Sequence, residues 1–271
     1  RLGAWAAGPL DFRKADVWMV IGINPPVSMT VAGGADAYVL ANPVKSIREA
    51  RQNGMKLIVI DPRVSETAKL ADLHIQPRPG RDGELIGSML HVILREGWQD
   101  KEFCDEYVNG LADLQRLVQP FAPESCAGSI GVSVDEIELA ARMFAKDATY
   151  GMAGGGTGSD MARHSNLAEH LIEALNVVCG RFPREGEPLT NTPVLGPDAG
   201  KRAEVWLPDN RELEVSAKSS SHGLGSVKGT MMSAELADEI LHEGEHRLRA
   251  LICVGGNPAA ALPDQRKAED A

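Results

Sequence analysis

The stretch Val17-Trp18-Met19-Val20-Ile21 runs directly into Gly22-Ile23-Asn24-Pro25-Pro26. An apolar run that stops abruptly at Gly and Asn-Pro is typical of a buried strand that leads into a turn. Two further runs follow the same pattern: Lys56–Ile60 ends at Asp61-Pro62-Arg63, and the shorter Leu73–Ile75 comes next. We therefore expect three successive strands, each with a turn at its carboxyl end.

Helical patterns lie between and after these strands. Pro, Asp or a Ser-x-x-Glu capping box opens them, and Gly or Asn-Gly ends them. We expect helices at about 43–53, 82–97, 133–146 and 167–178, with another strand at 148–153. Strands that alternate with helices predict an α/β fold of mostly parallel sheets with flanking helices.

The composition excludes several classes of protein. Of the 271 residues, 43% are hydrophobic and 24% are charged, as in ordinary globular domains. A formal net charge of −10 disfavours nucleic acid as a partner. The apolar runs are far shorter than the roughly 20 residues of a membrane helix, so direct membrane insertion is not expected. The four cysteines have no CxxC spacing, which predicts buried single thiols, with no iron–sulfur or zinc site held by this chain.

The turn after the first strand is repeated near the end of the chain. Gly22-x-Asn24-Pro25 and Gly255-x-Asn257-Pro258 each follow an apolar run. The repeat predicts two related Rossmann-like lobes that present the same turn to one ligand, and two unrelated βα turns are the alternative. We expect a first lobe at 1–150 and part of a second at 151–271.

The second half of the chain has weaker patterns. We expect a loop-rich excursion at about 181–229, with short strands at 203–206 and 213–215. A helix at 233–242 and a last buried strand at 251–254 follow. Because the chain starts at Arg rather than Met and stops within a helix-like segment, we expect both termini to be truncated.

Polar residues follow the predicted strands, and open α/β sheets bind ligands at the carboxyl ends of their strands. Gly22 lets the backbone approach a ligand, and Asn24 can either brace its turn or hold a phosphate. Asp61 is placed to accept hydrogen bonds from ribose hydroxyls, and Arg63 to pair with a phosphate, with a solvated Asp-Pro turn as the alternative. Asp82 can accept two N–H donors from guanine, or simply cap its helix.

A glycine-rich segment, Gly154-Gly155-Gly156-Thr157-Gly158, resembles a loop that cradles phosphate. Met161 stands where GxGxxG has its third glycine, and no Gly-Lys-Ser/Thr follows. The segment therefore disfavours an ordinary nicotinamide-dependent dehydrogenase.

Taken in order, these motifs resemble the molybdopterin oxidoreductase family, whose members include relatives of dimethyl sulfoxide reductase, periplasmic nitrate reductase and formate dehydrogenase. The segments that carry the resemblance are Gly22–Pro25, Asp61–Ala68 with Ala71-Asp72, Pro79–Asp82, Gly156–Gly158 with Met161 and Arg163, and Gly255–Ala259. The resemblance implies the central α/β part of a catalytic subunit.

The resemblance also implies a cofactor, molybdopterin guanine dinucleotide with molybdenum or tungsten. It places Gly22, Asn24, Pro25 and Ser28 at the phosphates, Asp61, Arg63 and Ser65 at the guanosine end, Gly80, Arg81 and Asp82 at the guanine, Thr157, Gly158 and Met161 on the pterin side, and Asn257 in the matching turn of the second lobe. It identifies no catalytic residue and no metal ligand in this chain.

The resemblance implies two-electron or oxygen-atom transfer with a small-molecule redox substrate and an electron-transfer protein or subunit. The family's [4Fe–4S] motif and metal ligand are expected in a missing N-terminal part, so the fragment alone is expected to be inactive. The alternative is a molybdenum-free scaffold or electron-transfer subunit that resembles the large iron–sulfur subunit of respiratory complex I. Asp61 and Asp82 favour the cofactor binder, and the compartment stays open between cytoplasm and periplasm.

Overall fold

A computed structural model describes residues 4–5, 14–28, 42–184, 186–187, 205–206, 218–223, 225, 231, 233–245, 247–262 and 264–271. The chain divides into two compact units. The larger unit is Trp5–Val205, and the smaller is Trp206–Ala271 together with Arg1–Ala4. The boundary expected near residue 150 falls inside the larger unit. None of the described helices is long and apolar enough to cross a membrane.

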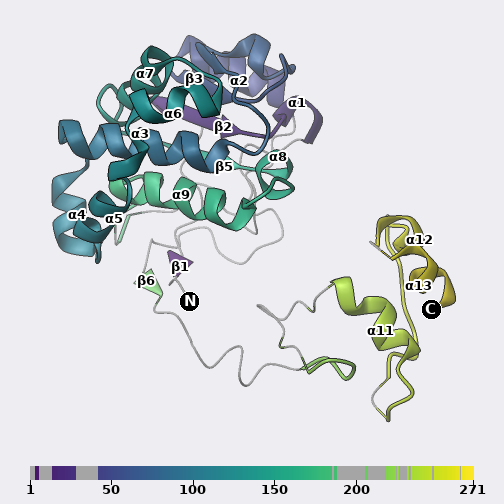
Figure 1. Ribbon diagram of the computed structural model, residues 1–271. Helices are drawn as coiled ribbons and strands as arrows, with labels where there is room; N and C mark the ends of the chain where they lie inside the picture. Colours follow the sequence, from purple (N-terminus) through teal and green to yellow (C-terminus); the bar gives the residue numbers. More distant parts are fainter. Residues whose placement is uncertain are drawn as a thin grey trace. The chain divides into compact units, whose positions relative to one another are not determined.

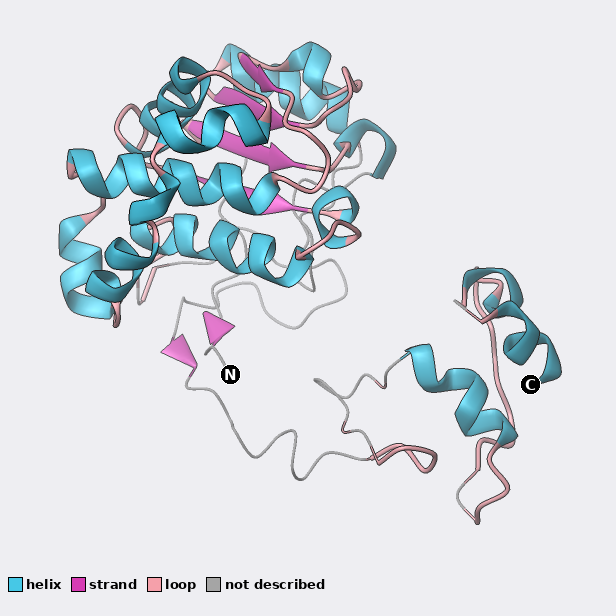
Figure 2. Cartoon of the chain, viewed as in Figure 1, coloured by secondary structure: helices cyan, strands magenta, loops and turns pink. Residues whose placement is uncertain are grey.

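A four-stranded parallel sheet organises the larger unit (Figures 1 and 2). In spatial order its strands are β4 (Leu73–Ile75), β3 (Lys56–Ile60), β2 (Val17–Ile21) and β5 (Gly151–Gly155). The predicted α/β class and the first three predicted strands are confirmed. Two strands of two residues, β1 (Ala4–Trp5) and β6 (Val205–Trp206), lie outside this sheet.

The carboxyl ends of all four strands lie at one edge of the sheet. Ile21 is opposite both Ile60 and Gly155, and Ile60 is opposite Ile75. The turns after these strands therefore share that edge, as the sequence predicted. The order of the strands reverses between β2 and β5, because β3 and β4 lie on one side of β2 and β5 on the other. Open α/β sheets bind ligands at such a reversal.

Helices and short 3₁₀ turns make up the rest of the larger unit. They are α1 (Pro25–Ser28), α2 (Pro43–Gln52), η2 (Ala68–Leu70), α3 (Asp82–Glu96), α4 (Lys101–Tyr107), α5 (Leu111–Leu117), η3 (Gln119–Phe121), α6 (Pro123–Ile130), α7 (Val134–Ala145), α8 (Thr157–Asp160) and α9 (Ser165–Val178). The expected end signals are confirmed: Ser133 and Glu136 form a reciprocal capping box, and Gly97 ends α3 in the left-handed conformation.

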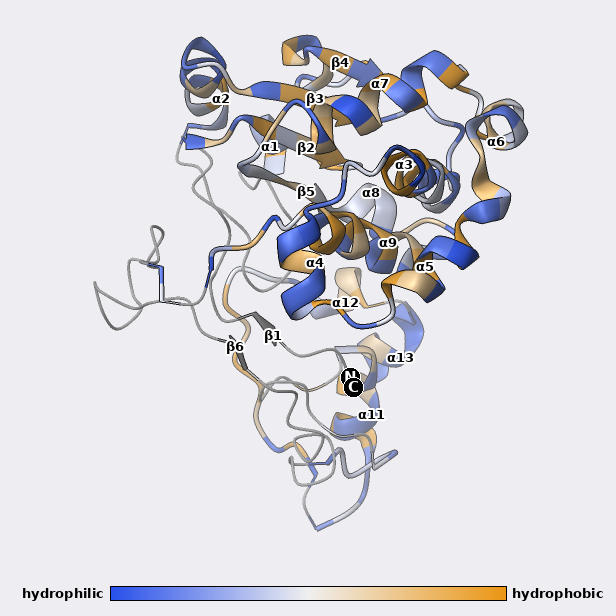
Figure 3. Ribbon diagram, turned by 90° about the vertical axis from the view of Figure 1, so that its left-hand side faces the viewer, coloured by the Kyte–Doolittle hydropathy of each residue, from blue (hydrophilic) through white to orange (hydrophobic). Residues whose placement is uncertain are grey.

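Side chains of the strands alternate between two cores, as the period of a β-strand requires. Met19 and Ile21 pack with α3, α7 and α9, whereas Trp18 and Val20 pack with Ile47 and Ala50 of α2. Figure 3 shows α2 on one side of the strands and the apolar α3 on the other. The unit is thus a layered α/β/α structure with the strand ends free at one edge.

The last strand of the sheet differs from its prediction. We expected it at 148–153 with a glycine loop after it, but β5 extends through Gly155. A side chain at Gly155 would overlap the carboxylate of Glu169, and one at Gly151 would overlap the carbonyl oxygen of Val17. Close packing, rather than loop flexibility, therefore requires these glycines.

The smaller unit contains η4 (Ser233–Glu235), α11 (Leu236–Leu241), α12 (Pro258–Ala261) and α13 (Gln265–Asp270). The buried strand predicted at 251–254 is wrong: Ile252 is 87% exposed, Val254 is 89% exposed, and no described strand pairs with this segment. Cys253 is exposed for the same reason, although the other three cysteines are buried as predicted. The strand expected at 213–215 lies outside the described residues.

A buried amide takes the place of a strand beside β5. Asn176 of α9 is 2% exposed, accepts a hydrogen bond from the N–H of Ala153 at 2.8 Å, and donates one to the carbonyl of Ala153 at 2.8 Å. Both backbone groups are buried and need partners. Asn176 therefore completes the free side of β5 and fixes α9 on the sheet.

Asn176→Ala should lower the free energy of unfolding by about 2–4 kcal/mol, because a buried donor and a buried acceptor both lose their partner. Urea denaturation followed by circular dichroism measures the change. Asn166→Ala, at an exposed position of the same helix, is the control and should change stability by less than about 0.5 kcal/mol. Equal losses in the two variants would contradict the role assigned to Asn176.

Candidate ligand-binding cleft

A cleft of about 610 Å³ opens at the carboxyl edge of the sheet. Turns after all four strands line it, with Gly22 after β2, Asp61, Pro62 and Arg63 after β3, Pro77, Arg78, Pro79, Gly80 and Asp82 after β4, and Thr157, Gly158, Met161, Ala162 and Arg163 after β5. The cleft thus lies where the strand order reverses, at the place that the fold predicts for a ligand.

Most of the predicted site residues meet in this cleft. Those that line it are Gly22, Asp61, Arg63, Gly80, Asp82, Thr157, Gly158 and Met161. Those of the larger unit that do not line it are Asn24, Pro25, Ser28, Ser65 and Arg81. Asn257 belongs to the smaller unit.

Two glycine turns form one wall of the cleft by direct backbone contact. The N–H of Gly158 donates to the carbonyl of Gly22 at 2.8 Å. A Cβ on Gly22 would lie 2.7 Å from the nitrogen of Ser159, and one on Gly158 would lie 2.6 Å from the oxygen of Gly22. Gly22 also has a φ of +59°, which side chains disfavour. The wall is therefore bare peptide, which a phosphate group can approach closely.

Two carboxylates face the cleft from neighbouring turns. Asp61 is 6% exposed, and its Oδ1 accepts a hydrogen bond from the N–H of Arg63 at 2.8 Å. Asp82 is half-buried and makes no hydrogen bond to another described residue. Burial raises the pKa of Asp82, and the charge of Asp61 raises it further. The alternative role for Asp82, as the N-cap of its helix, is wrong. Arg81 is the N-cap, and Asp82 is the first residue of the helix.

Three arginines line the same cleft, and one of them has a structural role. The guanidinium of Arg78 donates to the carbonyls of Gly128 at 2.8 Å and Ser129 at 3.2 Å, so it is held against the end of α6. Arg63 and Arg163 are exposed, and their side chains have no hydrogen bond or ion pair with the described residues. The cleft thus offers acceptors and cations that do not neutralise one another.

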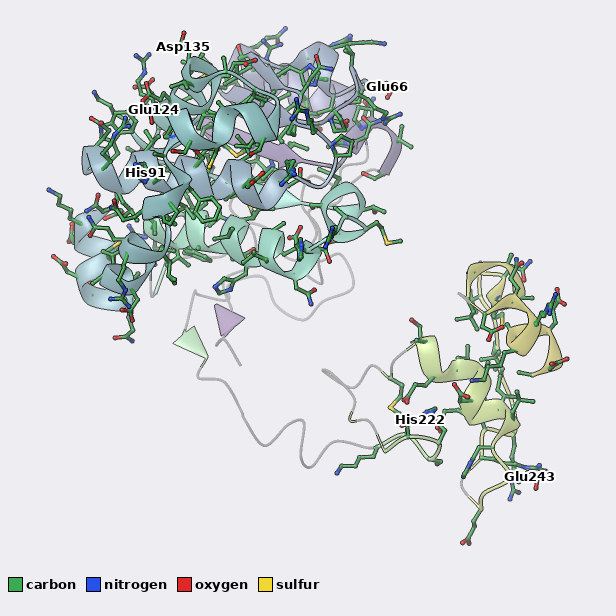
Figure 4. The ribbon with its side chains drawn as sticks, viewed as in Figure 1. Glu66, His91, Glu124, Asp135, His222 and Glu243 are labelled. Carbon is green, nitrogen blue, oxygen red and sulfur yellow. The ribbon has the colours of Figure 1, made fainter. Side chains whose placement is uncertain are left out.

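Asn24 links two of the turns. Its Nδ2 donates to Glu66 at 2.7 Å, and its Oδ1 accepts from the hydroxyl of Thr67 at 2.7 Å and from the N–H of Thr67 at 3.3 Å. Figure 4 labels Glu66 at the surface beside α1. Of the two roles considered for Asn24, these contacts favour the bracing of its turn.

Other predicted residues that do not line the cleft also have protein partners. Ser65 is buried and accepts a hydrogen bond from the N–H of Ala68 at 3.2 Å. Arg81 pairs with Glu84 at 3.0 Å. Pro25 is the buried first residue of α1, and the hydroxyl of Ser28 donates to the carbonyl of Asn24 at 3.2 Å. These residues shape the turns around the cleft.

The repeated turn has the same local structure in both units. Gly22 and Gly255 both have left-handed φ values, +59° and +70°. Each following Pro begins a four-residue helix, α1 or α12. The carbonyls of Asn24 and Asn257 each accept hydrogen bonds from two backbone N–H groups of that helix. Asn257 is exposed, and its side chain does not cap α12.

No metal centre is evident in the part of the chain that the structure describes. It contains no group of three or more His, Cys, Asp or Glu residues that could hold a metal ion. The cleft itself offers hydrogen-bond acceptors, guanidinium groups and bare backbone. It therefore suits a polar organic anion that also carries N–H or O–H donors.

The family model described as molybdopterin oxidoreductase matches residues 2–261. This chain belongs to the molybdopterin oxidoreductase family. Formate dehydrogenase H of Escherichia coli strain K12 is 37% identical over 145 residues, which are 53% of this chain and 19% of that protein. Periplasmic nitrate reductase of Desulfovibrio desulfuricans is 33% identical over 189 residues, 65% of this chain and 23% of that protein.

A solved structure is also similar. Acetylene hydratase from Pelobacter acetylenicus matches with a TM-score of 0.56 and 26% sequence identity, over 66% of this chain and 24% of that chain. The chain spans 19–24% of the length of these three relatives. The family that the motifs indicated is confirmed, and with it a molybdopterin cofactor carrying molybdenum or tungsten as the family's cofactor.

Sequence reasoning did not include Arg78 among the site residues, and it treated Arg163 as a motif residue and a candidate contact for an anion without assigning it to the site. Arg163 follows the glycine-rich segment closely, which is a signal for anion binding, but its value depends on β5 lying beside β2. The sequence does not reveal that pairing. Arg78 adjoins the Pro-Gly-Arg-Asp segment, and only the structure shows that its guanidinium is engaged by α6.

Gly158→Ala should separate the two glycine turns, because the new methyl group overlaps the carbonyl of Gly22. We expect a loss of about 1–3 kcal/mol in the free energy of unfolding. Gly128→Ala is the control, since Gly128 lies within α6 and a Cβ there meets no atom within 4 Å. It should be neutral or stabilise by up to about 1 kcal/mol. A stable Gly158→Ala protein would mean that the turns do not depend on this contact.

Proposed function

We propose that the cleft of the larger unit binds the guanosine diphosphate part of a molybdopterin guanine dinucleotide. The observation that carries the proposal is the placement of unpaired carboxylates and unpaired guanidiniums around a wall of bare glycine backbone. A guanosine diphosphate has the matching groups: N–H donors on the base, hydroxyl donors on the ribose, and anionic phosphates.

Each part of that ligand has a partner in the cleft. Asp82 accepts hydrogen bonds from N1–H and the exocyclic amine of guanine, since its two oxygens match two parallel donors. Asp61 accepts from the ribose hydroxyls with the oxygen that Arg63 does not use. The phosphates lie against Gly22 and Gly158, where no side chain stands between ligand and backbone.

The remaining predicted residues act through these turns or beyond them. Asn24, with Pro25 and Ser28, fixes the first turn, Ser65 fixes the second, and Arg81 holds the start of α3 through Glu84. Gly80, Thr157 and Met161 border the ligand, with the last two on the pterin side. Asn257 supplies the equivalent turn of a second, related lobe.

The whole protein, on this proposal, is a molybdenum- or tungsten-dependent oxidoreductase of which this chain is the central part. The bound metal supplies two-electron or oxygen-atom transfer to or from a small-molecule substrate, while the residues of this chain hold and orient the cofactor. A metal ligand and a [4Fe–4S] cluster belong to parts outside this chain. A relative from Methanococcus maripaludis is named F420-dependent formate dehydrogenase 2 subunit alpha, and its being one subunit of a larger enzyme supports a partner subunit for the whole protein.

One finding favours a second activity. Acetylene hydratase, the similar solved structure, is named for the addition of water rather than for a redox reaction. The same cleft would then hold the cofactor for a hydration. The other alternative, a molybdenum-free scaffold, is disfavoured because it would not need the carboxylates of Asp61 and Asp82 in the cleft. Molybdenum or tungsten content of the whole protein, together with assays of both reactions, separates these alternatives.

Asp82→Asn should weaken binding of guanosine diphosphate by about 2–4 kcal/mol, because an amide turns a donor toward a donor of guanine. Calorimetric titration of the purified chain with GDP, and with ADP for comparison, measures the effect. Asp135→Asn is the control, at an exposed position in the first turn of α7. Unchanged GDP affinity in Asp82→Asn, or equal affinity of the native chain for ADP, would sink the assignment of guanine.

Acid should weaken GDP binding at a higher pH than an ordinary carboxyl group would predict. The pKa of Asp82 is raised in the folded chain, so the carboxylate is protonated, and loses an acceptor, as the pH falls through that raised value. A raised pKa also means that protonation of Asp82 stabilises the fold, so this group does not cause unfolding there.

The measurement is the dissociation constant of GDP from neutral pH downward, in the native chain and in Asp82→Asn. The native chain should show the pH-dependent loss, and the variant should have weak affinity with little change over the same range. A variant that keeps the full pH dependence would show that another group controls it.

A further inference from the structure

A half-buried carboxyl group lies behind the glycine turn and does not line the cleft. Glu169 belongs to α9, which packs against both β5 and α8 (Figure 1). Among the described residues, no lysine, arginine or histidine pairs with it. Burial raises the pKa of Glu169, and the charges of Asp160 and Asp82 raise it further, although a hydrogen bond from Ser159 opposes them. A carboxyl group held among other acids costs folding free energy, which points to a specific role for it.

The face of α9 that meets the sheet places Glu169 at the end of β5. Glu169 and Asn176 are seven residues apart, about two helical turns, and so lie on one face of α9. From this face Asn176 bonds both backbone groups of Ala153. Glu169 lies against Gly155, where a side chain would overlap its carboxylate. Ala153 and Gly155 share one face of the strand, so the contact that fixes α9 on β5 also brings Glu169 to the strand end.

A buried hydroxyl connects Glu169 to the glycine turn. Ser159 of α8 is fully buried, and its Oγ donates a hydrogen bond to Oε1 of Glu169 at 2.7 Å. The same Oγ accepts a hydrogen bond from the N–H of Gly156 at 3.1 Å. The carbonyl of Gly156 is also near, at 2.9 Å, but a hydroxyl has one proton and the shorter bond goes to the carboxyl oxygen. Glu169 therefore orients the hydroxyl that bonds the turn.

The turn bonded by Ser159 is the one that touches Gly22. The N–H of Gly158 donates to the carbonyl of Gly22, and a Cβ on Gly22 would lie 2.7 Å from the nitrogen of Ser159. We propose that Glu169 is a positioning residue, which acts through Ser159 to fix the glycine turn of the cleft wall against Gly22. Its effect on a ligand rests on the proposed function of the cleft, whereas its effect on the turn does not.

The first test measures amide hydrogen exchange of Gly156 and Gly158 by NMR, in the purified chain without ligand. Glu169→Met keeps the length of the side chain but removes the acceptor, so exchange of both amides should become about tenfold faster or more. The amide of Met19, inside β2, should stay within about twofold. Glu169→Gln should exchange like the native chain, because its amide oxygen accepts the same hydrogen bond. Glu106→Met, at an exposed position of α4, is the control and should change neither rate.

The second test asks whether Glu169 acts through Ser159. Ser159→Ala removes the hydroxyl and should itself speed exchange of the two turn amides. In that background, Glu169→Met should change exchange by less than about twofold, since the connection is already broken. Native exchange rates in Glu169→Met, equal rates in the Met and Gln variants, or fully additive effects with Ser159→Ala would each overturn the proposal. If Glu169→Met does not fold, Glu169→Ala takes its place in the same comparisons.

Calorimetric titration with GDP measures the consequence for the cleft. Glu169→Met should weaken GDP binding about fivefold or more, and Glu169→Gln should stay within about twofold of the native chain. If exchange of the turn speeds up while GDP affinity is unchanged, the positioning role is wrong and the proposed function stands. If the native chain does not bind GDP, the proposed function fails, and exchange in the free chain still decides whether Glu169 fixes the turn.

Discussion

The contact between the backbones of Gly22 and Gly158 is the constraint on which the cleft depends. Pairing of β2 with β5 brings Ile21 opposite Gly155, so the turns that follow must share one small space. They fit only because neither turn carries a Cβ at the contact, and a Cβ on Gly156 would also meet the side chain of Ile23 at 2.8 Å. This contact joins the start of the sheet to its last strand and leaves peptide groups, rather than side chains, at the point where the strand order reverses.

The charges of Asp61 and Asp82 in the cleft are arranged differently from the charge of Asp72. On the far side of the sheet, Asp72 is neutralised by Arg51 and Lys56, and its pKa is lowered by the hydrogen bond from Arg51 and by those charges in spite of burial. In the cleft, burial raises the pKa of Asp82, and a second carboxylate raises it further. Such an arrangement costs folding free energy unless a ligand provides the missing partners. Unsatisfied charges of both signs around one hollow are therefore better explained by a ligand than by the needs of the fold.

Local sequence signals predicted the parts of the fold that depend on local physics. The apolar run at β2, the capping box at Ser133 and the glycine after α3 each act within a few residues, and each was correct. The position of β5 depended instead on which strand it pairs with, and its glycines are explained only by the atoms of Val17 and Glu169 that approach them.

The apolar run at 251–254 shows that a local signal can also predict a strand that does not form. Its sequence is typical of a strand, but a strand also needs a neighbour to bond with its backbone, and no described strand provides one. The candidate site was predictable to the extent that residues at strand ends converge. The sequence could not predict that Asn24 and Ser65 lie outside the cleft lining. Their hydrogen-bond partners, Glu66, Thr67 and Ala68, are set by the packing of separate turns.

The two Gly-x-Asn-Pro turns separate what a motif determines from what its surroundings determine. In both units the glycine is left-handed, the asparagine carbonyl accepts hydrogen bonds from the next helix, and the proline begins that helix, so four residues are sufficient to specify the turn. The asparagine amide behaves differently. That of Asn24 bonds with Glu66 through its Nδ2 and with Thr67 through its Oδ1, whereas that of Asn257 has no partner among the described residues. A shared motif therefore establishes a shared backbone shape, and the role of its polar side chain has to be argued separately for each copy from the groups around it.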